Sequence, residues 1–543
     1  MSSNHDPSPP SVSEESETYF AGGDASRTTW RIWSVGAVFL AANLWCFTGS
    51  SAARLFVHGP WFFVYMLKMT IEIIACNFSA FYLLVAFFYR QPHASVQPSF
   101  SSRINTETIV VYLCSDDLNT SALENIVRFC WGSKVGLVIH DDSRSYTSRQ
   151  SVDAFVSQLR LKYDAAIQVL RRPIKSGGKP GAVNNVVAHL PEGIQYLLLC
   201  DSDSYILSPG ILEDATPLLA DGRVAVVQFR SIGYTYAEEC LGYCILAESI
   251  DFYDAFVTFM DRFGWSPFLG HNALLRVSAF KEVGGFTPGQ LADDIDFSIK
   301  VRLLGYKIRY LRSGVCGERH PASYGSLRRR TAKWAYGCTQ ILMRWSRKIT
   351  RSARLTLYEK LTFFLTVGYY HFQALLLIYL AIFYLLLPFD STNAVAASSL
   401  LRSAGLILLI TYLPSISFFL RSKRIANWPS AATCWGFTYG SQDMVIGSAI
   451  IRCLFGRQMA WIPTNGVQEK SQPQTFALEQ ILAFLILAIA ILKRPTLLVL
   501  PTTVLFAGKF LITPYLDRLF FNGSPTRSRG IGSVGEKTGR IQA

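Results

Sequence analysis

Charged residues are scarce in this sequence of 543 residues, and negative charge is scarcer than positive. Only 17% of the residues are charged, and 52 lysines and arginines against 38 aspartates and glutamates give a formal net charge of +14. A basic excess suits a nucleic-acid partner, but here the basic residues do not alternate with aromatic residues along one binding face. They cluster beside apolar stretches instead, so the sequence indicates no nucleic-acid partner.

Paired cysteine spacing is also absent, although the chain has 11 cysteines. Cys240 and Cys244 are one helical turn apart, but no second pair and no neighbouring histidines complete a zinc site. We therefore expect reduced core thiols, as in a cytosolic setting. Residues 1–29 are polar and rich in serine, proline and glutamate, which predicts a disordered tail without a signal peptide.

Long apolar stretches are what the chain does have, since hydrophobic residues make up 50% of it. A membrane helix needs about 20 such residues. The stretches predict about six spans, two each within residues 30–89, 361–420 and 476–514, with an interfacial or re-entrant segment at 428–475. Neighbouring basic clusters are typical of cytosolic helix ends beside anionic lipid. We therefore expect a multi-pass integral protein of the cell membrane, in contact with the lipid bilayer, with a basic cytosolic tail at 515–543.

Residues 105–345 have the composition of an ordinary α/β domain, which we expect to be cytosolic. Apolar runs that predict strands lie at 108–114, 135–140, 166–170, 196–200 and 224–229. Helical patterns at 122–131 and 209–219 alternate with these runs, which is typical of a doubly wound, mostly parallel sheet. The basic stretch at 328–346 is amphipathic, and we expect it to lie along the membrane surface.

Two pairs of aspartates follow predicted strands. Asp201 and Asp203 come directly after the fourth strand, and Asp141 and Asp142 come at the end of the second. The carboxyl ends of parallel strands meet at one edge of a sheet, where α/β proteins bind ligands. Carboxylates one residue apart can share one Mg²⁺ or Mn²⁺ ion, with diphosphate oxygens as its other ligands. The alternative is a polar turn after a core strand.

A third pair of aspartates, Asp293 and Asp294, opens a helical pattern that stops at Gly305. Aspartates in a first helical turn are stabilised by the helix dipole and by capping, so a purely structural role is the alternative here. Taken together, the three pairs suit the transfer of a sugar from a nucleotide diphosphate. That reaction requires a nucleotide contact, a metal for the diphosphate, and a base for the acceptor hydroxyl.

Each of these tasks has a candidate in the sequence. The assignments are Asp142 with Asp141 for the nucleotide, Lys179 for the nucleotide or a phosphate, Asp203 with Asp201 for the metal, Asp294 with Asp293 for the general base, and Arg330, Lys333 and Trp334 for the diphosphate and the acceptor sugar. Lys179 lies in a glycine-flanked stretch, 176–185, which we expect to be a loop. His271 and Asn272 are further candidates at the acceptor end, and His271 could instead only hold its loop.

An ordered set of short motifs carries a resemblance to a known family. The motifs are Asp-Asp-Ser at 141–143, Gly-Lys-Pro-Gly-Ala-x-x-Asn at 178–185, Asp-Ser-Asp at 201–203, Gly-His-Asn-Ala-x-x-Arg at 270–276, Gly-Gly-Phe at 284–286, Ala-Asp-Asp at 292–294 and Arg-x-x-Lys-Trp at 330–334. Over residues 105–345 the chain resembles the membrane-embedded family 2 glycosyltransferases, which include cellulose, hyaluronan, chitin and curdlan synthases and the bacterial periplasmic-glucan glucosyltransferase. Each motif alone is weak, and the order is what makes the resemblance specific.

The resemblance implies a GT-A fold, an inverting mechanism, a UDP-sugar donor, and Mg²⁺ or Mn²⁺. It also implies the site roles assigned above, and it adds Thr464 in a gating-type loop at 461–466 that closes over the nucleotide. The expected product is a β-linked polysaccharide, with export through the spans of the protein as a further expectation. UDP-glucose is the favoured donor, because the motif at 270–276 is most similar to the periplasmic-glucan enzyme, and UDP-N-acetylglucosamine is an alternative.

The chain departs from the family pattern at four positions. Ala292 and Asp293 replace Thr-Glu, and Arg330 replaces a glutamine. Lys333 replaces an arginine, so the positive charge is kept but the bidentate contact of a guanidinium is lost. These changes leave open a non-processive enzyme that acts on a lipid or a short glycan. They also leave open a degenerate protein that only binds, and the predicted spans leave open a transporter. The sequence indicates no oligomeric state.

Overall fold

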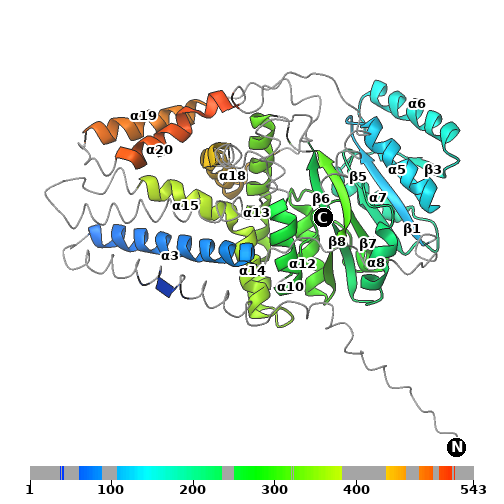
Figure 1. Cartoon of the computed structure of the whole chain (residues 1–543), viewed down its shortest axis with the longest axis horizontal. Helices are drawn as coiled ribbons and strands as arrows, with labels where there is room; N and C mark the ends of the chain where they lie inside the picture. Colours follow the sequence, from blue (N-terminus) through cyan, green and yellow to red (C-terminus); the bar gives the residue numbers. More distant parts are fainter. Residues whose placement is uncertain are drawn as a thin grey trace, which may run out of the picture.

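The computed structural model describes residues 60–87, 107–234, 250–319 except 264, 321–381 except 322, 436–459 except 439, 476–492 and 500–516, with single residues at 37, 40, 41, 44 and 519. A sheet with its covering helices lies at one end of the long axis, and further helices lie at the other (Figure 1). Helix α13 (Tyr324–Arg351) stands between the two parts, because it packs against both α12 (Asp293–Leu303) and α18 (Asp443–Leu454).

Eight strands form one sheet, in the order β3-β2-β1-β4-β7-β6-β8-β5. Their bounds are Thr108–Cys114 for β1, Gly136–Asp141 for β2, Ile167–Leu170 for β3, Tyr196–Cys200 for β4, Tyr205–Ile206 for β5, Val224–Tyr234 for β6, Ala273–Arg276 for β7 and Lys307–Arg319 for β8. Strands β3, β2, β1 and β4 are parallel, whereas β7 is antiparallel to both of its neighbours and β5 is antiparallel to β8. The predicted α/β class is confirmed, and the sheet is mixed rather than mostly parallel.

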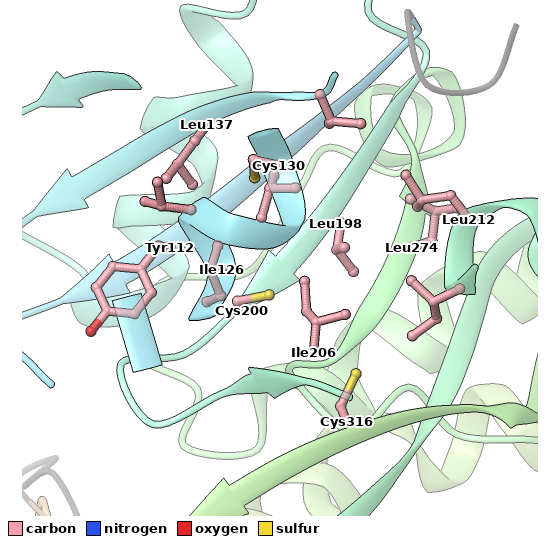
Figure 2. Packing of buried hydrophobic residues seen from close by; sticks show 14 of the residues in the cluster. Tyr112, Ile126, Cys130, Leu137, Leu198, Cys200, Ile206, Leu212, Leu274 and Cys316 are labelled. Carbon is pink, nitrogen blue, oxygen red and sulfur yellow. The ribbon is translucent and has the colours of Figure 1, made fainter. Parts of the chain in front are cut away.

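Helices cover both faces of the sheet. Helices α5 (Thr120–Ser133), α6 (Tyr146–Lys162) and α8 (Ile211–Leu219) cover one face, and α7 (Gly178–Ala188), α11 (Val277–Glu282) and α12 cover the other. Figure 2 shows the first face, where Ile126 of α5 and Leu212 of α8 belong to the same packed cluster as Tyr112 and Leu198 of the strands. Strands buried on both faces need apolar residues at every position, which is why β1 and β4 are unbroken apolar runs.

Two parts of the domain differ from the sequence prediction. The glycine-flanked stretch at 176–185 is mostly helix α7 rather than a loop, and it begins after Gly177, whose φ of 75° suits a residue without a side chain. The motif at 270–276 contains strand β7, which the sequence analysis did not predict. Strand β8 and helix α6 were not predicted either. Because β1, β2 and β4 are parallel neighbours, the aspartates that follow β2 and β4 lie at one edge of the sheet.

The apolar helices at the other end are α3 (Pro60–Phe87), α14 (Leu357–Val367), α15 (Tyr369–Ala381), α19 (Ala477–Leu492) and α20 (Leu500–Leu511). Among the described residues, no helix combines the length and the apolar character needed to cross a membrane. This finding contradicts the predicted multi-pass membrane location. Helix α3 contains the charged residues Lys68 and Glu72, and Gly368 divides one predicted span into two shorter helices, α14 and α15.

Several predicted segments lie outside the described residues. They are the tail at 1–29, most of the first predicted span at 30–48, the predicted span at 399–420, the gating-type loop at 461–466 and most of the basic tail at 515–543. The predicted amphipathic stretch at 328–346 is part of α13, and its apolar face packs within the protein. Trp345 and Ile341 of α13 are buried in an aromatic cluster with residues of α10 (Thr258–Phe263) and α14, so this face is not available to a membrane surface.

Candidate functional site

The turn after β4 presents the carboxylates of Asp201 and Asp203. The backbone N–H of Asp201 donates to Ser204 Oγ at 2.9 Å, and the N–H of Arg319 donates to Asp203 Oδ2 at 3.2 Å. The end of β8 therefore closes onto the Asp-x-Asp turn. Burial raises the pKa of Asp203 to about 6, and the neighbouring Asp201 carboxylate adds to this effect.

Lys179, in the first turn of α7, holds the Asp201 carboxylate. Its Nζ lies 2.6 Å from Oδ1 and 2.7 Å from Oδ2 of Asp201, so the ammonium contacts both oxygens. Burial lowers the pKa of Lys179, but the carboxylates of Asp201, Asp293 and Asp294 outweigh burial and raise the pKa above its ordinary value. The structure thus joins α7, the turn after β4 and the start of α12.

His271 contacts the same carboxylate from another direction. Its Nδ1 lies 3.8 Å from Asp201 Oδ2, and its Nε2 lies 2.6 Å from Oε2 of Glu318, in β8. Burial lowers the pKa of His271, but Glu318 and Asp201 reverse this effect and raise the pKa to about 9. His271 is therefore a cation at neutral pH. Sequence reasoning missed Glu318, which lies in a strand that the pattern did not reveal.

Asp293 and Asp294 begin helix α12 beside this cluster. Asp294 Oδ1 accepts a hydrogen bond from the backbone N–H of Ile295 at 2.8 Å. Burial raises the pKa of Asp293 to about 7, with a further contribution from Asp294, and burial also raises the pKa of Asp294. Asp293 Oδ2 is buried and has no hydrogen-bond partner in the part of the chain that the structure describes. These two carboxyl groups are therefore suited to take up a proton.

Gly270 leaves space next to Asp294. Its φ is 92°, and a Cβ added at this position would lie 3.5 Å from Asp294 Oδ2. A larger side chain at Gly270 would be strained and would crowd the carboxylate. The glycine before His271 thus keeps the approach to Asp294 open, a role that the Gly-His-Asn motif alone did not suggest.

Helix α13 brings Lys333 to the same group of charges. Burial lowers the pKa of Lys333, and the carboxylates of Asp293, Asp294 and Asp201 act in the opposite direction. One turn further along α13, a Cβ added to Gly337 would lie 2.9 Å from both the Cβ and the backbone N of Ala292. Small residues on both sides therefore let α13 approach the start of α12, which explains why alanine is tolerated at 292.

Trp334 lies on the exposed side of the same helix segment, next to the half-buried Arg330. The Arg330 guanidinium lies 4.6 Å from the centroid of the Trp334 ring, and the Trp334 side chain is 39% exposed. A partly exposed indole beside a half-buried lysine can offer a flat face to a sugar ring. The structure thus places these two residues beside Lys333.

Asp142 is paired, and its partner was not predicted. Arg172 Nη2 and Nε donate to its carboxylate at 2.5 and 3.0 Å. Arg172 also donates to the carbonyl oxygens of Ser176 and Gly178, at 2.7 and 3.0 Å. Arg172 therefore ties Asp142 to the segment that precedes Lys179. A basic residue just after the third predicted strand is the sequence signal that could have identified it.

Asp141 and Asn272 are buried and hydrogen-bonded to the scaffold, although Asn272 Oδ1 has no hydrogen-bond partner among the described residues. Asp141 accepts from Arg171 Nε at 2.7 Å and from the Ser143 N–H at 2.9 Å. Burial raises the pKa of Asp141, but these hydrogen bonds outweigh it and lower the pKa below its ordinary value. Asn272 Nδ2 donates to Ser231 Oγ at 3.0 Å inside the sheet. Both residues are completely buried.

The described side chains offer few ligands to a metal ion at this site. Among the described residues, no three histidine, cysteine, aspartate or glutamate side chains converge as a metal site. The hard carboxylates of Asp201 and Asp203 suit Mg²⁺ or Mn²⁺, and the Lys179 ammonium already stands as a cation against Asp201. The residues therefore fit a divalent ion whose remaining ligands come from a diphosphate and water. Thr464 lies outside the described residues.

Comparison with known proteins finds a family match for part of the chain. Residues 196–420 match the family described as Glycosyl transferase family group 2. The chain is 24% identical over 292 residues to a probable glucomannan 4-beta-mannosyltransferase of Arabidopsis thaliana, which is 52% of each chain. It is 24% identical over 252 residues to the probable glycosyltransferase YdaM of Bacillus subtilis, which is 44% of this chain and 56% of that one.

Among solved structures, the chain is similar to the mannosyltransferase PcManGT from Pyrobaculum calidifontis in complex with GDP-Man and Mn²⁺. The TM-score is 0.46 at 15% identity, over 73% of this chain and 100% of that chain. The chain spans about half the length of the curated relatives described above. The family match and the two relatives agree with the predicted resemblance to family 2 glycosyltransferases.

Proposed function

We propose that this chain transfers a hexose from a nucleoside diphosphate sugar to a hydroxyl of a growing glycan, with inversion at the anomeric carbon. The observation that carries the proposal is the meeting of three acids around one lysine. The carboxylates of Asp201, Asp293 and Asp294, which lie in two distant stretches of the chain, all act on the ammonium of Lys179. The acid proposed to hold the metal for the leaving diphosphate and the acids proposed for the general base thus share one site, as glycosyl transfer requires.

Asp294 is the general base of this mechanism. It takes the proton of the acceptor hydroxyl while the hydroxyl oxygen bonds to the anomeric carbon and the bond from that carbon to the diphosphate breaks. Burial, which raises the pKa of Asp294, brings the carboxylate closer to the basicity that proton abstraction needs at neutral pH. Gly270 leaves room beside Asp294 for the hydroxyl. Asp293, as a neighbouring acid of raised pKa, helps to keep the proton within the pair.

Cations on the other side of the site receive the leaving diphosphate. Lys179 and Lys333 are both half-buried beside the acid cluster, and a diphosphate would draw their charges towards its oxygens. Asp201 and Asp203 would hold Mg²⁺ or Mn²⁺, which supplies Lewis-acid stabilisation of the developing negative charge. Asp142, fixed by Arg172, is the proposed contact for the nucleotide. Trp334, next to Arg330, is the proposed platform for the acceptor sugar.

The sugar of the donor is proposed from a sequence motif. The motif at 270–276 favours UDP-glucose, whereas the relatives in plants are named as mannosyltransferases that act on glucomannan. A UDP-sugar remains our proposal for the donor. A β-linkage follows from inversion of an α-linked donor. The length of the product distinguishes a polysaccharide synthase from an enzyme that adds a single sugar.

The test offers radiolabelled UDP-glucose, UDP-N-acetylglucosamine and GDP-mannose in parallel to the purified full chain with Mn²⁺ and a glycan acceptor. We expect one donor to give a labelled glycan that a β-specific glycosidase degrades. We expect Asp294→Asn to lose at least about a hundredfold in rate, because a general base contributes on that scale. Asp164→Asn, at an exposed aspartate of the same domain, is the matched control and should retain activity. Full activity in Asp294→Asn would refute the assigned base.

A further inference from the structure

The contact between Lys179 and Asp201 has a consequence for the order in which ligands bind. Lys179 Nζ contacts both carboxylate oxygens of Asp201, at 2.6 and 2.7 Å, and His271 Nδ1 lies 3.8 Å from one of them. An ammonium is a compact point charge, and at this distance it fills the space in which a divalent ion would bind Asp201. In the structure without a donor, the Asp-x-Asp turn therefore already carries a cation.

We propose that Lys179 blocks the metal position on Asp201 until a diphosphate arrives, so that the divalent ion binds only together with the nucleotide. This inference rests on the proposed function, because it takes the Asp-x-Asp turn as the metal site. In the free protein Lys179 neutralises Asp201. In the loaded protein the diphosphate attracts Lys179, and the ion takes its place between the carboxylates and the phosphate oxygens. Lys179 is thus a positioning residue for the metal.

The local structure allows this exchange. Lys179 lies in the first turn of α7 behind Gly177 and Gly178, whose φ values of 75° and 57° are both in the left-handed region. Its side chain is 17% exposed, so the ammonium lies close to the surface that a donor would approach. A lysine that leaves a carboxylate for a phosphate exchanges one ion pair for another, so the movement costs little free energy when a diphosphate is present. Without a diphosphate the lysine would lose its partner inside a buried site.

The exchange of Lys179 for the ion also explains why few metal-ligating side chains converge at this site among the described residues. No set of three metal-ligating side chains is found in the described ranges, so the protein alone offers the ion a poor site. Phosphate oxygens supply the missing ligands and remove the competing ammonium at the same time. Both effects make metal and nucleotide bind cooperatively, and the coupling has to be the same in both directions.

The experiment measures Mn²⁺ binding to the full chain by the electron paramagnetic resonance signal of free Mn²⁺, with no sugar transfer involved. Titrations are made with Mn²⁺ alone, and with UDP or GDP after subtraction of Mn²⁺ bound by nucleotide in solution. Lys179→Met keeps the length of the side chain and removes the ammonium. We expect it to bind Mn²⁺ alone at least about tenfold tighter than the unchanged chain, since the blocked fraction of sites no longer lowers the apparent affinity.

The Mn²⁺ affinities of the unchanged chain and Lys179→Met, each measured with and without nucleotide, distinguish a block from a simple change in local charge. Removal of a positive charge alone would tighten Mn²⁺ binding equally with and without nucleotide. Release of a block tightens it only without nucleotide, so the affinities of the two proteins should converge when UDP or GDP is saturating. Lys175→Met is the matched control, because Lys175 Nζ donates to the carbonyl oxygen of Ser143 rather than to an acid, and it should match the unchanged chain.

The outcomes distinguish this inference from the proposed function. Equal Mn²⁺ affinity of the unchanged chain and Lys179→Met, without nucleotide, would overturn the block and leave the glycosyltransferase proposal intact. No Mn²⁺ binding by the unchanged chain in any titration, nucleotide included, would refute the metal site of the proposed function itself. Lys179→Gln, with a polar side chain, repeats the measurement if the methionine variant does not fold, as judged by circular dichroism.

Discussion

The candidate site contains two pairs of carboxylates whose surroundings differ, Asp141 with Asp142 on one side and Asp293 with Asp294 on the other. On the side built by β1 to β4, Asp141 and Asp142 each accept hydrogen bonds from an arginine, and the pKa of Asp141 lies below its ordinary value because Ser143 and Arg171 outweigh its burial. On the side built by α12 and α13, burial raises the pKa of Asp293 and Asp294. The first side is fixed in geometry and charge, which suits recognition of a donor. The second side keeps basicity, which suits proton transfer.

The largest expected effect comes from the removal of a cation on the fixed side. Arg172→Leu leaves the nearly buried carboxylate of Asp142, with a side chain only 12% exposed, without its arginine. Loss of one partner of a buried ion pair costs about 3–5 kcal/mol of unfolding free energy. Urea denaturation followed by circular dichroism measures the change. Arg223→Leu removes an arginine from an exposed pair with Asp221, and it should cost less than about 1 kcal/mol.

Equal losses in these two variants would show that Asp142 is not held by Arg172 in solution. The fixed side would then lose its distinguishing feature, and the contrast between the two sides would fail. A loss confined to Arg172→Leu, together with weaker UDP binding, would tie the rigidity of this side to donor recognition.

The next effect tests how α13 is held against α12. Gly337→Ala places a Cβ 2.9 Å from the Cβ and the backbone N of Ala292, and backbone atoms cannot rotate away. Overpacking of this kind costs about 1–3 kcal/mol and moves Lys333 relative to Asp294. We expect kcat to fall more than KM rises. Gly132→Ala is the same change at an exposed position of α5 with open space around it, and it should stabilise the protein by about 0.5–1 kcal/mol.

The pH dependence of the reaction sharpens the contrast in basicity. Asp294 must be ionised to accept a proton, so kcat/KM should fall as the pH falls through the raised pKa values of the acid pair. The pKa of Asp293 lies at about 7, because of burial and its neighbour Asp294, so the loss should begin close to neutral pH. Asp293→Asn removes one of the two titrating groups, so the fall of kcat/KM at acid pH should move to lower pH. A fall near pH 4 in the unchanged protein would contradict the raised values.

The comparison also shows what sequence patterns can and cannot predict here. Strands β1, β2 and β4 are apolar because both of their faces are covered, so their positions and the acids at the ends of β2 and β4 were predictable. Strand β7 is four residues long and antiparallel, and no periodicity marks it. Glu318 and Arg172 become site residues only through contacts across the sheet. The prediction of membrane spans was wrong, because no helix among the described residues is both long enough and apolar enough to cross a membrane.

The smallest expected effect concerns Trp334, at the exposed rim of the basic side. Trp334→Ala removes a 39% exposed ring and its contact with Arg330, 4.6 Å from the ring centroid. An exposed cation–π contact contributes about 0.5–1 kcal/mol, so stability should change little. If the ring supports the acceptor sugar, extension of the glycan should fall severalfold, whereas hydrolysis of the donor should stay near its original rate. Product length on gels and nucleotide release, measured in the same reaction, give the two rates. A parallel fall in both would move Trp334 from the acceptor to the donor, and the division of the site into a fixed donor side and a basic acceptor side would have to be redrawn at α13.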